Sequence, residues 1–339
     1  MMFKVVALAV AALGSSVAFG SDLGRFMLPQ PDALLVSVSD GSQQGPYSKA
    51  MSEANRNGEL EKAVWGAIEA QNPGQKETIA AVRAALNGFC AGAKRVEFAA
   101  SVKAAPDANG KPAASVSMAI AGLPEAGRML ARLAADYPQA LSFDNGVLTA
   151  KGVSPSPFQA WIDAGVLRVA DGRASRVAPG TVFEQGTAYG RMLARLDGRP
   201  FSGLCFADPV GLSCRFMKPE QREALKSDPN WLLAQKVKSV ALFAQEGKDQ
   251  PVFNLWLIVG LDSAESATAV VNALTGFKAL ADMWIAAQDQ SATGVERAGV
   301  DEAKDLLSAL QVEAKGSRVV VRFSQNVSKQ LELLKTLAK

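Results

Sequence analysis

The chain has 339 residues, of which 48% are hydrophobic, and 36 basic residues face 33 acidic ones for a formal net charge of +3. This composition is ordinary for a globular protein and argues against disorder. The mild charge offers little attraction to nucleic acid or to an anionic membrane surface. Histidine is absent. Ser-His-Asp and Cys-His catalysis are therefore excluded, and the commonest nitrogen ligand of zinc and copper is missing.

The first residues are typical of a secretory signal. Lys4 precedes the apolar run 5–13, and small residues lead to a cleavage site near Gly20. That run is too short to span a bilayer, and no later run is long and uncharged enough to do so. Cleavage removes only Lys4, so 36 − 1 basic residues face 33 acidic ones and the net charge becomes about +2. We expect a signal peptide at 1–20, a linker at 21–31, export to the periplasm or outside the cell, and no stable membrane insertion afterwards.

Residues 32–200 are expected to form a first α+β unit. Val96, Phe98 and Ala100 alternate with smaller or polar residues, which is the period of a half-buried strand. Alternation of this kind predicts the other strands, apolar residues at helical spacing predict the helices, and turn residues mark the connections between them. The expected elements are a strand at 32–39, helices at 59–71 and 75–90, a hairpin over 95–122, a helix at 124–137, a hairpin at 140–152, a short helix at 154–165, a strand at 166–172 and a helix at 187–196.

Residues 201–339 are expected to form a second α+β unit. In its longest apolar stretch, Leu255 and Leu257 share one face of a strand and Trp256 lies on the other, so both faces of this sheet are expected to be buried. The expected elements are a hairpin at 201–216, a helix at 218–231, a hairpin at 236–261, a helix at 262–280, a loop at 291–299, a hairpin at 309–323 and a terminal helix from residue 324.

The two units follow one order of strand, hairpin, strand, helix, strand, hairpin, strand. Residues 121–123 correspond to residues 259–261 at the corner between strand and helix. The sequence thus predicts an α+β fold of two related antiparallel-sheet units, with helices packed on the sheets, produced by an internal duplication.

The signal, the opening strand at 32–39 and the closing hairpin with its final helix resemble a loose group of exported bacterial proteins of unknown function. These proteins are abundant in planctomycete and verrucomicrobial lineages. The resemblance is one of pattern over most of the chain. It implies an envelope location and transfers no catalytic residue.

The chain carries no phosphate-binding glycine loop, no Cys-x-x-Cys pair and no calcium-binding loop. Carboxylate pairs could act without histidine, but the spacing of the acids does not bring two together. Ser48 with Lys49, and Ser328 with Lys329, are sequence neighbours whose side chains diverge on a helix. The sequence therefore predicts no catalytic, cofactor-binding or metal-binding residues. The acids considered are Asp40, Glu59, Asp163 and Glu184.

The three cysteines allow one disulfide. Cys205 and Cys214 flank a turn at 208–211, and an oxidising compartment would permit a cross-strand bond between them. Cys90 lies in a predicted helix and is expected to be a buried thiol.

Two further sets of residues are candidate binding surfaces. The first is a basic set that could hold an anionic polymer or headgroup, although a solvated face partly neutralised by acids is the preferred interpretation. The second centres on Trp256, which could line a pocket, although core packing is preferred. The basic set comprises Arg168, Arg173, Arg176, Arg191, Arg195 and Arg199.

The function expected from these observations is non-catalytic binding of an unidentified partner or ligand in the envelope. Two alternatives stay open. One is a histidine-free hydrolase that uses carboxylates or Ser and Lys. The other is a carrier of an apolar ligand held between the sheet and a helix near Trp256.

Overall fold

The computed structural model describes residues 23, 26–28, 30–40, 45–54, 58, 92–106, 112–151, 157–171, 201–247, 249–289 and 293–326, and nine scattered positions between 62 and 88. The predicted signal peptide, the predicted helix at 187–196 and most of the predicted helices at 59–71 and 75–90 lie outside these residues.

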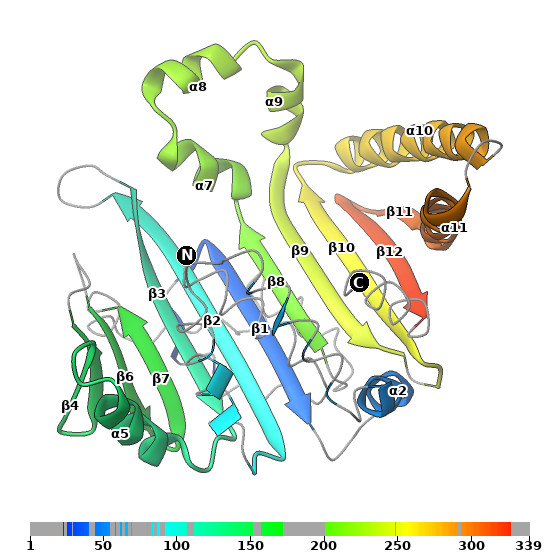
Figure 1. Cartoon of the computed structure of the whole chain (residues 1–339). Helices are drawn as coiled ribbons and strands as arrows, with labels where there is room; N and C mark the ends of the chain where they lie inside the picture. Colours follow the sequence, from blue (N-terminus) through cyan, green and yellow to red (C-terminus); the bar gives the residue numbers. More distant parts are fainter. Residues whose placement is uncertain are drawn as a thin grey trace.

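Within the described residues the fold is α+β and is built on one antiparallel sheet of twelve strands (Figure 1). The strand order is β11-β12-β10-β9-β8-β1-β2-β3-β7-β6-β5-β4. The strands are β1 (Ala33–Asp40), β2 (Arg95–Pro106), β3 (Pro112–Ala121), β4 (Leu141–Asp144), β5 (Val147–Ala150), β6 (Phe158–Asp163), β7 (Val166–Asp171), β8 (Phe201–Ala207), β9 (Val237–Glu246), β10 (Val252–Leu261), β11 (Gln311–Lys315) and β12 (Arg318–Asn326). The helices are α2 (Pro46–Ala54), α5 (Ala126–Asp136), α7 (Pro209–Phe216), α8 (Pro219–Leu225), α9 (Pro229–Ala234), α10 (Ala264–Asp289) and α11 (Gly294–Ala309).

The strands that precede residue 172 and those that follow residue 200 occupy opposite halves of this sheet. The halves join where β1 pairs with β8, in a register that places Leu35 opposite Leu204. The two predicted units therefore share one sheet, and they meet at β1 and β8.

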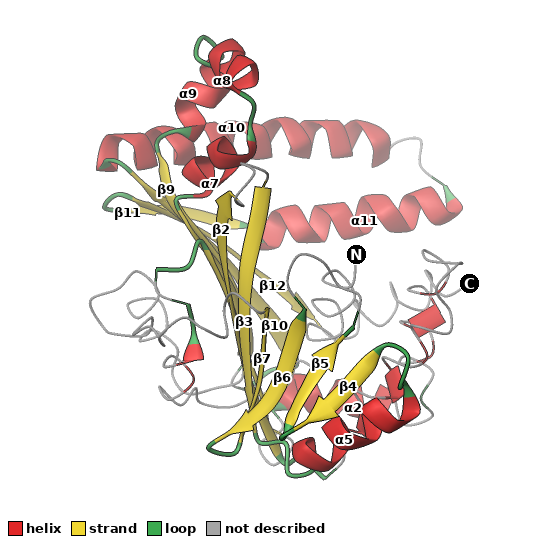
Figure 2. Ribbon diagram, turned by 90° about the vertical axis from the view of Figure 1, so that its left-hand side faces the viewer, coloured by secondary structure: helices red, strands yellow, loops and turns green. Residues whose placement is uncertain are grey.

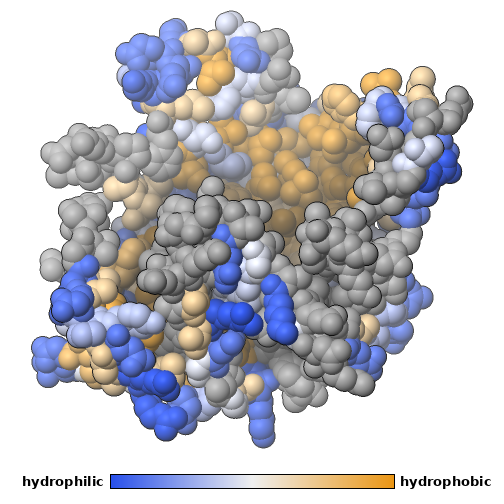
Figure 3. Space-filling model, in the orientation of Figure 1, coloured by the Kyte–Doolittle hydropathy of each residue, from blue (hydrophilic) through white to orange (hydrophobic). Residues whose placement is uncertain are grey.

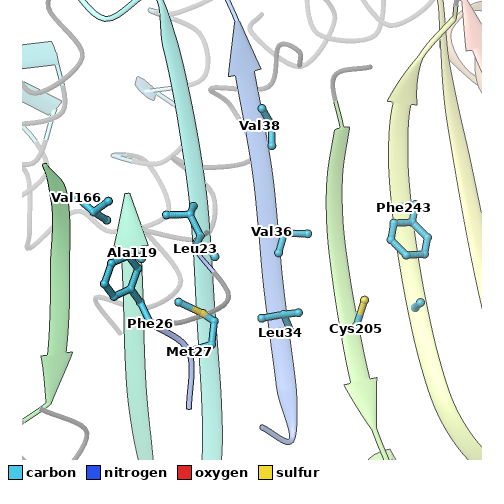
Figure 4. Packing of buried hydrophobic residues seen from close by; sticks show 12 residues of the cluster. Leu23, Phe26, Met27, Leu34, Val36, Val38, Ala119, Val166, Cys205 and Phe243 are labelled. Atoms are coloured by element: carbon cyan, nitrogen blue, oxygen red, sulfur yellow. The ribbon is translucent and has the colours of Figure 1, made fainter. Parts of the chain in front are cut away.

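The back face of the sheet carries the largest buried cluster, which includes the segment that follows the predicted signal (Figure 4). Leu23, Phe26 and Met27 are each at most 4% exposed against β1, β2 and β3. Small side chains on β2 and β3 let this segment approach the sheet closely. The Ser101 hydroxyl accepts a hydrogen bond from the Leu28 amide at 2.9 Å, and the buried Ser117 hydroxyl donates to the Phe26 carbonyl. These bonds satisfy main-chain groups of an irregular segment that burial would otherwise leave unpaired.

Helices cover the two ends of the front face. In the first half, Leu130 of α5 packs with Leu148 and Leu167 of the sheet. In the second half, Leu274 of α10 packs with residues of the sheet that include Val319. Apolar positions three and four residues apart on each helix supply these contacts, which is the spacing of an amphipathic helix.

Helices α10 and α11 form an antiparallel pair that projects from the sheet (Figure 2). Asp289, at the end of α10, lies 2.9 Å from Arg297 and 2.6 Å from Lys304, both on α11. The hydrogen bond from Lys304 and the charge of Arg297 hold the pKa of Asp289 below its usual range. This ion-pair group links the two helices near their connection.

Several local predictions are wrong. Residues 154–165 were expected to form a short helix, yet Phe158–Asp163 is β6, and Trp161 pairs across to Arg168 of β7. The hairpin expected at 201–216 is β8 followed by α7, because Asp208 caps a helix: its carboxylate accepts from the Gly211 amide.

Later elements also differ from expectation. The loop expected at 291–299 overlaps α11, which starts at Gly294. Helix α10 runs to Asp289, nine residues beyond the expected end at 280. The terminal helix expected from residue 324 is wrong at its start, because β12 continues to Asn326.

Candidate functional site

A row of apolar side chains crosses the front face from strand to strand. Leu35 of β1 lies opposite Leu204 of β8, Leu204 opposite Leu242 of β9, and Leu242 opposite Leu257 of β10. Directly opposite residues in an antiparallel sheet point to the same side. The row continues through Val321, which α10 covers, and in the other direction to Val169, which packs with the α5 cluster.

The middle of this row is only partly covered. Leu242 is 43% exposed although it lies near the centre of a long strand, and Leu35, Leu204 and Leu257 are half-buried. We call these four residues the leucine floor. The expectation that the second sheet half is buried on both faces is therefore wrong, because α10 covers the outer strands and leaves the floor beside it open.

Hydrophobic surface lines a hollow between the α7–α9 group and α10 (Figure 3). Leu232 of α9, in the first of these helix groups, is 49% exposed. Monomeric soluble proteins rarely expose large contiguous apolar patches, and such patches usually mark sites of interaction.

Trp256, the predicted pocket residue, lies on the opposite face from the leucine floor. It is half-buried against the back-face cluster and pairs across to Phe243, which is 4% exposed. The preferred interpretation as core packing fits this position. A ligand held between the sheet and α10 would contact the front face, which Trp256 does not reach.

The predicted basic set is described at one position only. The Arg168 side chain is 12% exposed and lies 4.9 Å from the ring centres of both Phe26 and Trp161, with Asp163 at 3.5 Å. Cation–π contacts of this kind stabilise a packed arrangement. Arg168 therefore joins the N-terminal segment to the sheet and does not present its charge to solvent. Arg173, Arg176, Arg191, Arg195 and Arg199 lie outside the described residues.

The predicted disulfide is absent. Cys205 and Cys214 are both free thiols, the first buried in β8 and the second half-buried in α7. Burial raises the pKa of the Cys205 thiol to about 12. The prediction failed because it rested on two strands facing each other, whereas the second strand is a helix.

The buried carboxylates accept hydrogen bonds from main-chain amides. Asp32 accepts one hydrogen bond from the Ala104 amide at 2.8 Å and another from the Arg215 side chain at 3.0 Å. Asp171 accepts a hydrogen bond from the Val116 amide at 3.0 Å. Glu246 is the third buried acid, and the three lie on β9, on β7 and at the start of β1, strands that are not neighbours in the sheet.

Glu246 fixes the start of α2. Its two carboxylate oxygens accept hydrogen bonds from the amide and the hydroxyl of Ser48, at 2.7 and 2.9 Å. Free amides at a helix start attract a carboxylate in this way. Burial, together with Glu246, raises the pKa of Tyr47 to about 12. Ser48 thus anchors a helix, and its neighbour Lys49 is exposed.

The remaining candidate acids are described only in part. Asp163 pairs with Arg168, Asp40 is described only in its backbone, and Glu59 and Glu184 lie outside the described residues. Within the part of the chain that the structure describes, no three acids, histidines or cysteines come close enough to hold a metal ion.

The leucine floor was missed by reasoning from the sequence. The signal was present, since Leu204, Leu242 and Leu257 each occupy alternate positions of apolar strands. The sequence does not show the register between the strands, which brings the three side chains into one row. It also does not show the path of α10, which leaves these side chains partly uncovered.

No helix within the described ranges is long and apolar enough to cross a bilayer. Comparison of the chain with protein-family models, with curated proteins and with solved structures finds no match.

Proposed function

We propose that this is a non-catalytic exported protein that binds a partner or ligand through the leucine floor. The observation that carries the proposal is the 43% exposure of Leu242 between two half-buried leucines. Covering apolar area yields roughly 25 cal/mol per Å², so an open apolar surface of this kind favours an apolar group of a ligand or partner.

The chemistry of the buried acids supports binding over hydrolysis. A carboxylate-dependent hydrolase needs two titratable groups that converge at one concave site. Asp32, Asp171 and Glu246 are instead occupied by main-chain amides, by Arg215 and by Ser48.

The proposal is tested with the dye 1-anilinonaphthalene-8-sulfonate as an apolar probe. Leu242→Lys places a charge on the leucine floor, and we expect dye fluorescence to fall several-fold. Phe143→Lys is the matched control, because Phe143 is 39% exposed on β4 at the far end of the sheet. Equal fluorescence for both variants would show that the leucine floor binds nothing apolar.

The ligand itself is sought by mass spectrometry of protein purified from the envelope fraction. The wild-type protein should retain a lipid or peptide that Leu242→Lys loses and Phe143→Lys keeps. A ligand retained by all three proteins would place the binding site elsewhere.

Export is the second part of the proposal. Its support is the predicted signal, and the position of Leu23, which is 1% exposed only three residues after the expected cleavage site. The core thus begins almost immediately after that site. The intact mass of the secreted protein should correspond to a start near Ser21, and a mass that retains residues 1–20 would refute processing there.

We also propose that the sheet arose by duplication. The order β1-β2-β3-β7-β6 mirrors β8-β9-β10-β12-β11, with a helix inserted after β3 and after β10. Gly122 and Gly260 stand at the two corresponding corners, where an added Cβ would meet β2 and β9 respectively. The β6–β7 hairpin, and not the expected hairpin at 140–152, is then the counterpart of β11–β12. An experimental structure in which these halves do not superpose would refute the duplication.

A further inference from the structure

Helix α10 has a second apolar face that does not pack on the sheet. Its inner face uses Val270, Val271 and Leu274 against the strands. On the outer face, Phe277, Leu280, Met283 and Trp284 are between 62% and 70% exposed. Exposure of four large apolar side chains on two turns of one helix is unfavourable in water and marks an interaction surface.

A subset of the exposed apolar and small residues of α10 follows a heptad pattern. These six residues, which include Leu280 and Met283 but not Phe277, recur at alternating intervals of four and three, as at the a and d positions of a coiled coil. No charged residue occurs among these positions, and the pair of Lys278 with Asp282 lies on another side of the helix. We call this set the α10 seam; it comprises Ala269, Ala273, Gly276, Leu280, Met283 and Ala287.

The side chains of the α10 seam are small in its first half and large in its second half. Ala269, Ala273 and Gly276 occupy its first half, and Leu280 and Met283, flanked by Trp284, occupy its second. If two copies of α10 pack antiparallel about a two-fold axis midway between positions 276 and 277, Trp284 lies level with Ala269 of the other copy. Leu280 then lies level with Ala273. Each of these two large side chains faces a small one, which is the self-complementarity that a symmetric dimer requires.

Gly276 supplies an independent observation. Glycine inside a helix is unfavourable relative to alanine, and its lack of a side chain suits a position that another backbone approaches closely. A Cβ added at Gly276 would meet nothing within 4 Å in the chain itself. Among the described residues, the single chain gives this glycine no packing role. A second helix that approaches closely at Gly276, as helices do where small residues face each other, would give it one.

We infer that the protein forms a symmetric dimer through the α10 seams of two copies packed antiparallel. From the exposure of Leu280, Met283 and Trp284, together with the small residues of the α10 seam, each copy would bury on the order of 500 Å². Both copies together reach about the 1,000 Å² expected of a specific interface. That area is at the low end of the range, so the dimer should dissociate at micromolar concentrations.

The test is sedimentation velocity of the mature chain, starting at Ser21, from about 1 to 100 µM. The wild-type protein should shift from monomer to dimer over this range. Gly276→Leu fills the point of closest approach and should raise the dissociation constant about tenfold or more, as overpacking does. Because leucine favours helix over glycine, the monomer should melt no lower than the wild type.

Thr275→Leu is the matched control. It introduces the same side chain one residue away, at an exposed position outside the α10 seam, and should leave the dissociation constant unchanged. A wild-type protein that stays monomeric throughout the range overturns the proposal and assigns the α10 seam to a different partner. Equal loss of the dimer in both variants, or in neither, also overturns it.

A cross-linking experiment tests the antiparallel arrangement. Oxidation of a mixture of Ala269→Cys and Trp284→Cys proteins should produce heterodimers joined between those positions. Ala269→Cys alone should not link to itself through residue 269. Self-linking of Ala269→Cys at that position would show parallel helices and refute the arrangement.

Discussion

Met27 offers a direct test of the packing that closes the back face. Its side chain is 1% exposed, in the segment held by Ser101 and Ser117. Met27→Ala should lower the free energy of unfolding by about 2–5 kcal/mol, because it removes buried methylene groups and leaves a cavity. At an unfolding entropy of about 2.1 cal/mol/K per residue, each kcal/mol corresponds to roughly 1.5 °C for a mature chain of this length. We therefore expect the melting temperature to fall by about 3–8 °C.

The measurement is thermal unfolding of the mature chain followed by far-UV circular dichroism. Met27→Leu is the control, since it keeps the side-chain volume and should cost less than about 1.5 kcal/mol. If Met27→Ala melts within 2 °C of the wild type, the N-terminal segment does not pack on the sheet in solution. If Met27→Leu and Met27→Ala are equally destabilised, the loss does not come from cavity formation.

Three further predictions concern other parts of the structure. At pH 8, iodoacetamide should modify Cys214 in the folded protein and spare Cys205, whose pKa is about 12; a peptide linked through both residues would contradict the free thiols. Gly122→Ala should destabilise more than Gly146→Ala: both glycines have φ near +80°, which costs an alanine roughly 1–3 kcal/mol, but only at Gly122 would the Cβ lie 1.8 Å from a carbonyl oxygen. Because the pKa of Asp289 is lowered in the folded protein, its contribution is present above its unfolded pKa and lost as pH falls through the folded value. Asp289→Asn should thus melt below the wild type at pH 6 and level with it near pH 2, and a gap unchanged at low pH would refute the ionic link.

The predictions that succeeded rest on periodicity. The alternation of Val96, Phe98 and Ala100 gives β2, and the helical spacing around Leu130 gives α5, because each pattern reports a local period and one buried side. Predictions failed where two structures share a pattern. The segment around Trp161 was expected to be helical but is a strand, and Cys214 lies on a helix initiated by a single side-chain cap at Asp208.

The candidate sites were harder to predict than the helices and strands. The exposure of an apolar side chain depends on which surfaces stay uncovered once the helices and strands have packed together. Periodicity shows that Leu242 belongs to an apolar strand face, and that face was expected to be buried. Whether it is buried depends on how many covering elements the fold supplies.

A twelve-stranded sheet has two wide faces, and the described chain covers them unevenly. The N-terminal segment closes the back face, while α5 and α10 cover only the ends of the front face. Helix α10 also carries more apolar surface than its contact with the sheet can bury, since Leu274 faces the strands and Leu280 faces outward. The excess apolar residues that first indicated a deeply buried core therefore become the two surfaces on which a ligand and a second copy of the chain are expected to bind.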